Sequence, residues 1–313
     1  MENVNKIKLW LAQFRANFLP LAVILSLIGI IFAFKYQSSS INNINLLNLL
    51  MLIIGVVSSH ISVNLFNEYS DYKTKIDFST KRTPFSGGTG LLVEGKTKPE
   101  SVLKAAYITL FIGILIGAYF TFIAHWFLLI FIVIGALSVM YYTNFLSRYM
   151  LGEIFAGLTL GTFVVLGSYI ALTANESTPI THLIPLEVLI LSIPPGILTA
   201  QLLLLNEFPD AEFDKVGGRR HLVVIFGKKV AAKIYIAGHI TNYAIILFAP
   251  IFGITSYWVY IALLTLPFAA QASIAALKHN EEPPKLIAGM AKNVLVVLIT
   301  DFLIFLSVLI SRI

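Results

Sequence analysis

The sequence contains no cysteine and few charged residues. The absence of cysteine excludes disulfides, zinc–thiolate sites and thiol catalysis. Asp, Glu, Lys and Arg make up only 12% of the 313 residues, whereas an ordinary soluble domain carries about 25%. Hydrophobic residues make up 58%, and the mean hydropathy is +0.85. This balance excludes a disordered protein, a coiled coil and a typical soluble enzyme, and it indicates a polytopic membrane protein.

Nine apolar runs along the chain suit membrane-spanning helices. A hydrocarbon core of ~30 Å needs about 20 apolar residues per helix. The sequence therefore predicts an all-α protein with nine transmembrane helices. The predicted spans are 18–34, 46–66, 102–123, 126–142, 151–172, 183–205, 231–252, 254–277 and 294–310. Very short turns join the third span to the fourth and the seventh to the eighth, so each of these pairs is expected to form a helical hairpin.

The basic residues predict the orientation of these spans. If the N-terminus lies in the cytoplasm, 20 of the 22 Lys and Arg residues fall on the cytoplasmic side, and only Lys35 and Arg312 fall outside. This bias is the positive-inside pattern of membrane proteins. We therefore expect an integral protein of the cell membrane, with the N-terminus and the polar loops in the cytoplasm and the C-terminus outside. Anionic lipid headgroups explain the net charge of +6, so no nucleic-acid partner is expected.

The acidic residues gather in two cytoplasmic loops, which hold nine of the 16. The first cluster opens with Asn-Glu-Tyr-Ser-Asp at residues 67–71, and the second opens with Asn-Glu-Phe-Pro-Asp at residues 206–210. A basic pair and a glycine pair follow each of them, and the offset between the clusters is 139 residues. We interpret the chain as one transmembrane domain, 1–313, with an internal pseudo-repeat around 46–142 and 183–277.

Helical geometry places the polar side chains of each cluster on a common face. Asn67 and Asp71 lie four residues apart, and so do Asn206, Asp210 and Asp214. Oxygen-rich clusters of this kind suit hard cations. Mg²⁺ binds through one or two carboxylates and completes its shell with substrate phosphate oxygens.

Three further features bear on the same site. Asp77 lies six residues after Asp71, so it must sit on a turn if it joins the site. Pro209 favours an unwound or kinked helix end. The stretch 82–90 reads Arg-Thr-Pro-Phe-Ser-Gly-Gly-Thr-Gly and offers hydroxyls and backbone N–H groups that can cradle phosphate. Acids, bases and this loop together predict a magnesium–diphosphate site at the membrane face.

The remaining ionisable residues give weaker signals. His60, His125 and His221 are scattered and have no partners at metal-ligand spacing, so we interpret them as structural. Glu153 lies near a helix end. Asp301 lies inside the last predicted span, where an ionisable residue is a functional candidate by default. We expect it to meet a polar partner in the bundle or to bind an acceptor.

With these motifs the sequence resembles the UbiA superfamily of intramembrane prenyltransferases over nearly the whole chain. That family has nine transmembrane helices and two Asp-rich motifs, which follow helices two and six. Many members carry Asn-Asp-x-x-Asp-x-x-x-Asp as the first motif, but here Glu68 takes the second position and Lys75 the last. The acid appears instead as Asp77, and Arg-Thr-Pro follows at 82–84. This spacing is similar to the menaquinone-branch members, which prenylate 1,4-dihydroxy-2-naphthoate.

The resemblance implies an enzyme embedded in a lipid bilayer, with a UbiA-like bundle and a cytoplasm-facing cavity. Its implied reaction is the Mg²⁺-dependent transfer of a polyprenyl group from a polyprenyl diphosphate to an aromatic acceptor. The expected acceptor is 1,4-dihydroxy-2-naphthoate, in menaquinone biosynthesis. A segment at 141–148, Tyr-Tyr-Thr-Asn-Phe-Leu-Ser-Arg, matches a third family feature. It implies that Tyr142 lies near the reacting allyl group and Arg148 near the diphosphate.

Individual roles follow for the residues of these motifs. We predict that Asp71 and Asp77 hold one Mg²⁺ and that Asp210 and Asp214 hold another. Asp71, Asp210 and Tyr142 are the predicted catalytic residues, with the ring face of Tyr142 stabilising a developing allylic carbocation. Cationic and amide side chains are expected to bind the diphosphate and to stabilise its negative charge as it leaves. These predicted diphosphate-binding residues are Asn67, Lys75, Arg82, Arg148 and Asn206.

Two alternatives stay open. One is a UbiA-type enzyme with another acceptor, such as a different quinone ring, geranylgeranylglycerol phosphate or a tetrapyrrole, or a terpene cyclase. The other is a secondary transporter, because internal repeats and broken helices also mark that class. A transporter usually places its acids near mid-membrane, whereas the main clusters here lie at one face, and this favours the enzyme.

Overall fold

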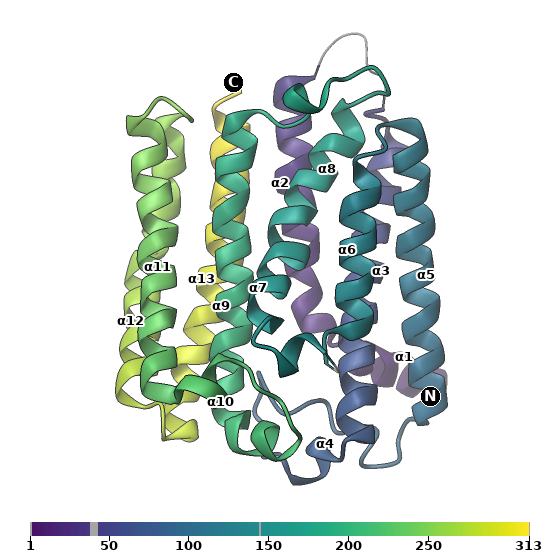
Figure 1. The fold of residues 1–313 in the computed structure, drawn as a ribbon, viewed down its shortest axis with the longest axis vertical. Coiled ribbons are helices and arrows are strands. Elements are labelled where there is room, and N and C mark those ends of the chain that lie inside the picture. Colours follow the sequence, from purple (N-terminus) through teal and green to yellow (C-terminus); the bar gives the residue numbers. More distant parts are fainter. Residues whose placement is uncertain (1, 38–42, 144, 313) are drawn as a thin grey trace.

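The computed structural model describes residues 2–37, 43–143 and 145–312. These residues form an all-helical bundle in which no strand occurs. Long helices run side by side, and the N- and C-termini lie at opposite ends of the bundle (Figure 1). The predicted all-α class is therefore confirmed.

Eight helical stretches in the described residues are long and apolar enough to cross a membrane. They are Ala16–Tyr36 (η1 and α2), Leu46–Lys73 (α3), Pro99–Ile123 (α5), Gly152–Thr173 (α7, η3 and α8), Leu186–Val216 (α9), Lys228–Ile251 (α11), Tyr257–Lys278 (η5 and α12) and Pro283–Ile310 (α13). The fourth predicted span is a shorter apolar helix of 14 residues, α6 (Leu128–Tyr141). The turn after α5 takes up the first residues of that predicted span, so the nine spans become eight long helices and one short one.

Short helices cap one end of the bundle. α1 (Glu2–Gln13), α4 (Ile76–Ser79) and α10 (Leu222–Phe226) all lie at the end where the chain begins (Figure 1). α4 follows α3, and α10 follows α9, so the two polar loops occupy the same end of the molecule. We call this end the polar end. The short helices η2 (Leu146–Arg148) and η4 (Ile180–His182) complete the secondary structure.

Helix α9 runs without interruption through Pro209, so of the two predicted outcomes, an unwound or a kinked helix end, the unwound end is wrong. Proline lacks the N–H that would bond to the carbonyl of Leu205, and its ring crowds the preceding turn. Leu205 and Phe208 are nevertheless fully buried at 0% exposure. Their packing holds the helix on course and overrides the local preference for a break.

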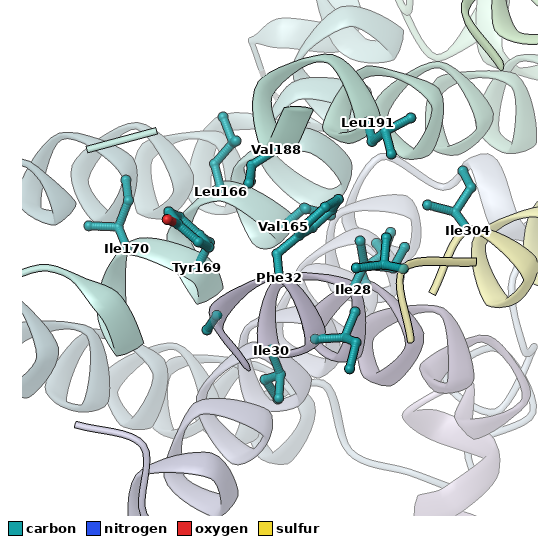
Figure 2. Close-up of a cluster of buried hydrophobic side chains, with 14 of the residues drawn as sticks. Ile28, Ile30, Phe32, Val165, Leu166, Tyr169, Ile170, Val188, Leu191 and Ile304 are labelled. Atoms are coloured by element: carbon teal, nitrogen blue, oxygen red, sulfur yellow. The ribbon is translucent and has the colours of Figure 1, made fainter. Parts of the chain in front are cut away.

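The main hydrophobic core lies between α2, α8, α9 and α13 (Figure 2). Ile28, Phe32, Val165, Leu191 and Ile304 are each 0% exposed. Between helices surrounded by lipid, such packing gains mainly dispersion energy and shape complementarity, because lipid tails are as apolar as the side chains. The core therefore holds the helices together along their length.

A seam of small residues brings η3 (Leu158–Thr162), a π-helical turn, against α9. A Cβ atom on Gly161 would lie 2.6 Å from Cα of Gly196, and one on Gly157 would lie 2.6 Å from the Gly196 carbonyl oxygen. Thr162 donates a hydrogen bond to the Ser192 carbonyl at 3.1 Å. Small residues of this kind allow close helix approach in membranes. The seam sets the distance between α7 and α9, which both carry side chains at the polar end.

Replacing Gly161 with alanine should destabilise the bundle, because the added Cβ would meet backbone at 2.6 Å. We expect a loss on the order of 1–3 kcal/mol in the free energy of unfolding, measured by SDS-induced unfolding in mixed micelles. Gly135→Ala in α6 is the matched control, since a Cβ there has nothing within 4 Å. Equal stability of the two variants would contradict the close backbone contact between η3 and α9.

Candidate active site

A polar pocket of about 90 Å³ lies at the polar end, between the ends of α3, α6 and α9. Both predicted motifs contribute to its wall, together with the N-terminal arm and the loop before α5. Seven of the ten predicted site residues line it: Asn67, Asp71, Asp77, Tyr142, Asn206, Asp210 and Asp214. Side chains that are far apart in the sequence therefore meet in one cavity.

The other three predicted residues, Lys75, Arg82 and Arg148, lie outside this wall and are exposed. Lys75 adopts a left-handed φ of 62° between α3 and α4. The Arg82 guanidinium lies 3.5 Å from the exposed carboxylate of Glu94. Arg148 lies in η2. The predicted contact of these three residues with a diphosphate stays a prediction.

Arg219 joins the two motifs inside the pocket. Its Nη2 donates to Oδ1 of Asp71 and to Oδ1 of Asn67 at 3.3 Å, and its Nη1 donates to Oδ1 of Asp214 at 2.9 Å. Burial alone would lower the pKa of Arg219, but the carboxylates of Asp71 and Asp214 raise that pKa above its usual value. The guanidinium therefore stays charged and ties the end of α3 to the end of α9.

A second ion pair joins the N-terminal arm to α3. Nε and Nη2 of Arg15 lie 3.0 and 2.9 Å from Oε1 of Glu68. Glu68 also accepts hydrogen bonds from the backbone N–H and the hydroxyl of Thr89, at 2.9 and 2.7 Å. Its carboxylate is thus fully engaged. Arg15, which also lines the pocket, adds a second positive charge to the wall.

Two glycines bring the loop between α4 and α5 against both motifs. The Gly87 N–H donates to Oδ2 of Asp210 at 3.0 Å. Gly88 has a φ of +68°, and a Cβ there would lie 2.9 Å from Oδ1 of Asp77. Only glycine accepts both the backbone angle and the close approach without strain. The loop that was predicted to cradle phosphate therefore contacts one carboxylate from each motif.

Several buried oxygen atoms of the pocket have no hydrogen-bond donor among the residues that the structure describes. They are Oδ2 of Asp77, Oδ1 of Asn206 and Oδ1 of Asp210. Burial, followed by the carboxylates of Asp71 and Glu68, raises the pKa of Asp77 to about 8. Carboxylate and amide oxygens are the hard ligands that Mg²⁺ prefers, and a divalent cation would relieve the repulsion between these carboxylates. The residues therefore fit a magnesium site.

Tyr142 follows the last residue of α6 and lines the pocket. Burial, followed by the carboxylate of Glu207, raises the pKa of its phenol well above the usual value. The hydroxyl therefore stays protonated, and the neutral ring presents an electron-rich face beside charged groups. Such a face suits contact with a developing cation, and the contact itself stays a prediction.

His221, the residue before α10, belongs to a buried acidic group beside the pocket. Its Nε2 lies 3.1 Å from Oδ2 of Asp214, and its Nδ1 lies 3.4 Å from Oε2 of Glu207. Ligand atoms of Glu153, Glu207 and His221 all lie within 4.8 Å of one another. His221, which we interpreted as structural because it has no partner at metal-ligand spacing along the sequence, therefore has such neighbours in space. Its partners come from α7 and α9, so spacing along the sequence does not report them.

Asp301 lies apart from the pocket lining. Its side chain is 0% exposed within α13. Neither carboxylate oxygen has a hydrogen-bond partner among the described residues, so the polar partner that we expected is not found in that part of the chain.

Arg15 and Arg219 line the pocket but were not among the predicted site residues. Arg219 belongs to the basic pair after the second motif, where Gly217 and Gly218 end α9 and turn the chain back. The Arg219 N–H then bonds to the Asp214 carbonyl at 2.9 Å. The sequence does contain a signal for Arg219. A glycine pair directly before an arginine indicates that the chain reverses there, which brings the arginine back toward the end of the preceding helix.

A larger, apolar cavity of about 180 Å³ lies deeper in the bundle, between α3, α5, α6 and the η3–α8 segment. Aliphatic and aromatic side chains dominate its wall, together with glycines 55, 113, 117, 135 and 167, of which Gly135 has open space at its Cβ position. Val139 of this wall precedes Tyr142 of the polar pocket by three residues, about one helical turn. The apolar cavity thus extends from the region of the polar pocket into the membrane-spanning part.

Known proteins resemble this chain over most of its length. The sequence matches the UbiA prenyltransferase family over residues 26–295. A 1,4-dihydroxy-2-naphthoate octaprenyltransferase from Bacillus subtilis (strain 168) is 30% identical over 260 residues, which cover 80% of this chain and 78% of the relative.

Two solved structures share the fold. The apo structure of a UbiA homolog from Aeropyrum pernix K1 has a TM-score of 0.66 at 15% identity, covering 95% of this chain and 98% of that one. A UbiA homolog from Archaeoglobus fulgidus, bound to DMAPP and Mg²⁺, has a TM-score of 0.51 at 14% identity, covering 92% and 98%. The helical arrangement is therefore common to all three chains.

Replacing Arg219 with glutamine should destabilise the protein, because Asp71 and Asp214 would then be buried without a counter-charge. Breaking a buried ion pair costs about 3–5 kcal/mol, measurable by unfolding in mixed micelles. Added Mg²⁺ should restore part of this loss. Arg220→Gln, at the exposed neighbouring position, should stay within about 0.5 kcal/mol of the natural protein. Equal stability of the two variants would argue against the bridge.

Proposed function

The chain belongs to the UbiA prenyltransferase family, and on this premise we propose that it transfers a polyprenyl group from a polyprenyl diphosphate to 1,4-dihydroxy-2-naphthoate. The observation that carries the proposal is the combination of a polar pocket, built from both motifs, with an apolar cavity in the same bundle. A polyprenyl diphosphate has the same two parts, a charged head and a long apolar tail. The Bacillus subtilis relative, a 1,4-dihydroxy-2-naphthoate octaprenyltransferase, supports this acceptor.

The pocket residues are proposed to hold Mg²⁺ in two sets, Asp71 with Asp77 and Asp210 with Asp214. Asp77 and Asp210 present free oxygens for this purpose. The other carboxylate of each set is engaged by Arg219. When bound, Mg²⁺ supplies positive charge that stabilises the diphosphate as it leaves.

The cationic and amide side chains of the wall are proposed to bind the diphosphate. Arg219 and Arg15 both line the pocket, and a guanidinium offers a fork of donors that matches phosphate oxygens. Asn67 and Asn206 are proposed to orient the head group from the two motifs. The exposed side chains of Lys75, Arg82 and Arg148 are proposed to attract the diphosphate through longer-range charge.

Tyr142 is proposed to face the reacting carbon. As the allylic carbon–oxygen bond breaks, positive charge develops on the prenyl group, and the ring face of Tyr142 stabilises that charge. A ring carbon of the acceptor forms the new carbon–carbon bond with the allylic carbon as diphosphate leaves. The acceptor regains its aromaticity by losing a proton from that ring carbon, or CO₂ where the carbon carries a carboxylate. Asp71 and Asp210 complete the proposed catalytic set, because the Mg²⁺ that they would hold attracts the charged head.

The apolar cavity is proposed to hold the first part of the prenyl tail. Gly135 keeps the wall open where a larger side chain would fill it, because nothing lies within 4 Å of its Cβ position. A tail in this cavity would leave its diphosphate near the polar pocket, since the two share α3 and α6.

The protein is an integral membrane protein, and we propose that its polar end faces the cytoplasm of the cell. The positive-inside pattern supports this orientation, with the N-terminus inside and the C-terminus outside. We further propose that one domain spans 1–313 and contains a duplication. In each half a long helix, α3 or α9, leads through a short one, α4 or α10, to a helical hairpin.

Purified protein with Mg²⁺, geranylgeranyl diphosphate and 1,4-dihydroxy-2-naphthoate should yield prenylated product by mass spectrometry. Asp71→Ala and Asp210→Ala should each lower turnover by at least ~10², because each removes a carboxylate from the pocket. Glu212→Ala is the control, since Glu212 is exposed on the same helix as Asp210.

An acceptor series separates the outcomes of this assay. If product forms with another aromatic acceptor but not with 1,4-dihydroxy-2-naphthoate, the proposed acceptor is wrong and the proposed prenyl transfer stands. Full turnover in either aspartate variant would contradict the proposed magnesium sites.

Replacing Gly135 with phenylalanine should shift the enzyme toward short prenyl diphosphates, because the ring would fill the apolar cavity. We expect turnover with geranylgeranyl diphosphate to fall at least ~10-fold relative to dimethylallyl diphosphate, since a filled cavity excludes several methylenes at about 0.8 kcal/mol each. Leu137→Phe, on the exposed face of α6, is the control. An unchanged ratio of rates in Gly135→Phe would place the tail elsewhere.

A further inference from the structure

A second group of buried ligands lies beside the polar pocket. Glu153 comes from α7, Glu207 from α9, and His221 directly precedes α10. Their exposed fractions are 3%, 7% and 1%. One ligand atom from each residue lies within 4.8 Å of the others. The three side chains thus converge on one point from three helices.

Two of these side chains are fixed through one atom and leave another atom free. Oε1 of Glu153 accepts the backbone N–H of Leu222 at 2.8 Å, and its Oε2 forms no hydrogen bond within the described residues. Nε2 of His221 lies 3.1 Å from Oδ2 of Asp214. Its Nδ1 faces Oε2 of Glu207 at 3.4 Å, and neither of these two atoms forms a hydrogen bond in the described part of the chain. A histidine that binds a metal usually donates its other ring N–H to a carboxylate in this way.

The basic partner of Glu207 within this group is the ring of His221, whose Nδ1 lies 3.4 Å from Oε2. Lys and Arg residues form no ion pair with Glu153 or Glu207 in the part of the chain that the structure describes. The nearby guanidinium of Arg219 is bound to Asp71 and Asp214. Two carboxylates buried side by side without a cation are costly. The group therefore has the composition, the orientation and the charge of a cation site.

We propose that Glu153, Glu207 and His221 bind a divalent cation of borderline hardness, such as Mn²⁺ or Zn²⁺. The imidazole nitrogen distinguishes this site from the polar pocket, because Mg²⁺ favours oxygen ligands whereas imidazole suits transition metals. Three protein ligands leave room for water in the shell. The proposal rests on this geometry and does not depend on prenyl transfer.

A cation at this point would act on the pocket in two ways. It would tie α7, α9 and α10 together at the polar end. It would also fix the imidazole of His221 so that Nε2–H donates to Asp214, which positions that carboxylate in the pocket wall. Glu207 lines both sites, so the cation would lie directly behind the wall.

The test uses purified full-length protein in saturating Mg²⁺, titrated with Mn²⁺ and followed by pulsed EPR. We expect a bound Mn²⁺ whose signal shows coupling to a ¹⁴N nucleus. His221→Ala should abolish that coupling. Glu153→Gln should weaken Mn²⁺ binding at least ~10-fold, while its amide oxygen still accepts the Leu222 N–H. Glu212→Gln, an exposed change on α9, should leave affinity unchanged.

Variants of the polar pocket separate this site from the magnesium sites proposed above. In Asp210→Ala the nitrogen-coupled Mn²⁺ should persist, even where transferase activity is lost. Mn²⁺ without nitrogen coupling, or coupling that survives in His221→Ala, would overturn the proposal. If His221→Ala does not fold, an unchanged affinity in Glu153→Gln would overturn it equally. Absence of prenyl transfer in the natural protein would leave this measurement intact.

Discussion

The ion bridge centred on Arg219 is the interaction on which the polar end of the molecule depends. One guanidinium takes a carboxylate from α3 and another from α9, Asp71 and Asp214. All three groups are largely buried, and charges interact far more strongly there than in water. Without the guanidinium, the two motifs would bring like charges together and separate the helix ends. The bridge therefore makes one pocket out of two acidic sequences.

Periodicity and composition predicted the features that depend on neighbouring residues in the sequence, namely the helices and the faces of single helices. The apolar runs gave the long helices, and spacing by four placed Asn206, Asp210 and Asp214 on one face of α9. The local preference of proline predicts that the helix unwinds at Pro209, but α9 continues through this residue. The buried side chains next to Pro209 stabilise the helix more than the proline destabilises it.

Contacts between distant segments could not be read from spacing. Arg15 reaches the pocket because its own backbone is left-handed and turns the N-terminal arm. Arg219 reaches the pocket because a glycine pair reverses the chain after α9. His221 finds Glu153 across 68 residues of sequence. Each contact depends on the path of a loop, which a single sequence does not fix. The two motifs met as predicted because long helices carry them to the same end.

Glycine serves two opposite purposes along the membrane-spanning part. At Gly157, Gly161 and Gly196 it lets backbones touch, so that no side chain fits between η3 and α9. At Gly135 and Gly167 the neighbours stay back, and the missing side chains leave space in the apolar cavity. The close backbone contacts hold η3 and α9 at a set distance. The missing side chains leave the apolar cavity open between helices that such contacts hold in place.

The charge of the pocket wall constrains how a diphosphate can enter the pocket. Five acidic side chains line the wall, together with two arginines. Arg15 is paired with Glu68, and Arg219 is shared between Asp71 and Asp214, so the charge of each guanidinium is already balanced by carboxylates of the protein. A multiply negative head group would therefore meet a wall that is already negative. Positive charge has to enter with it, and because such coupling is reciprocal, the diphosphate must also tighten the binding of the cation. The same carboxylates that repel the head group when alone are thus the reason that it binds when a cation is present.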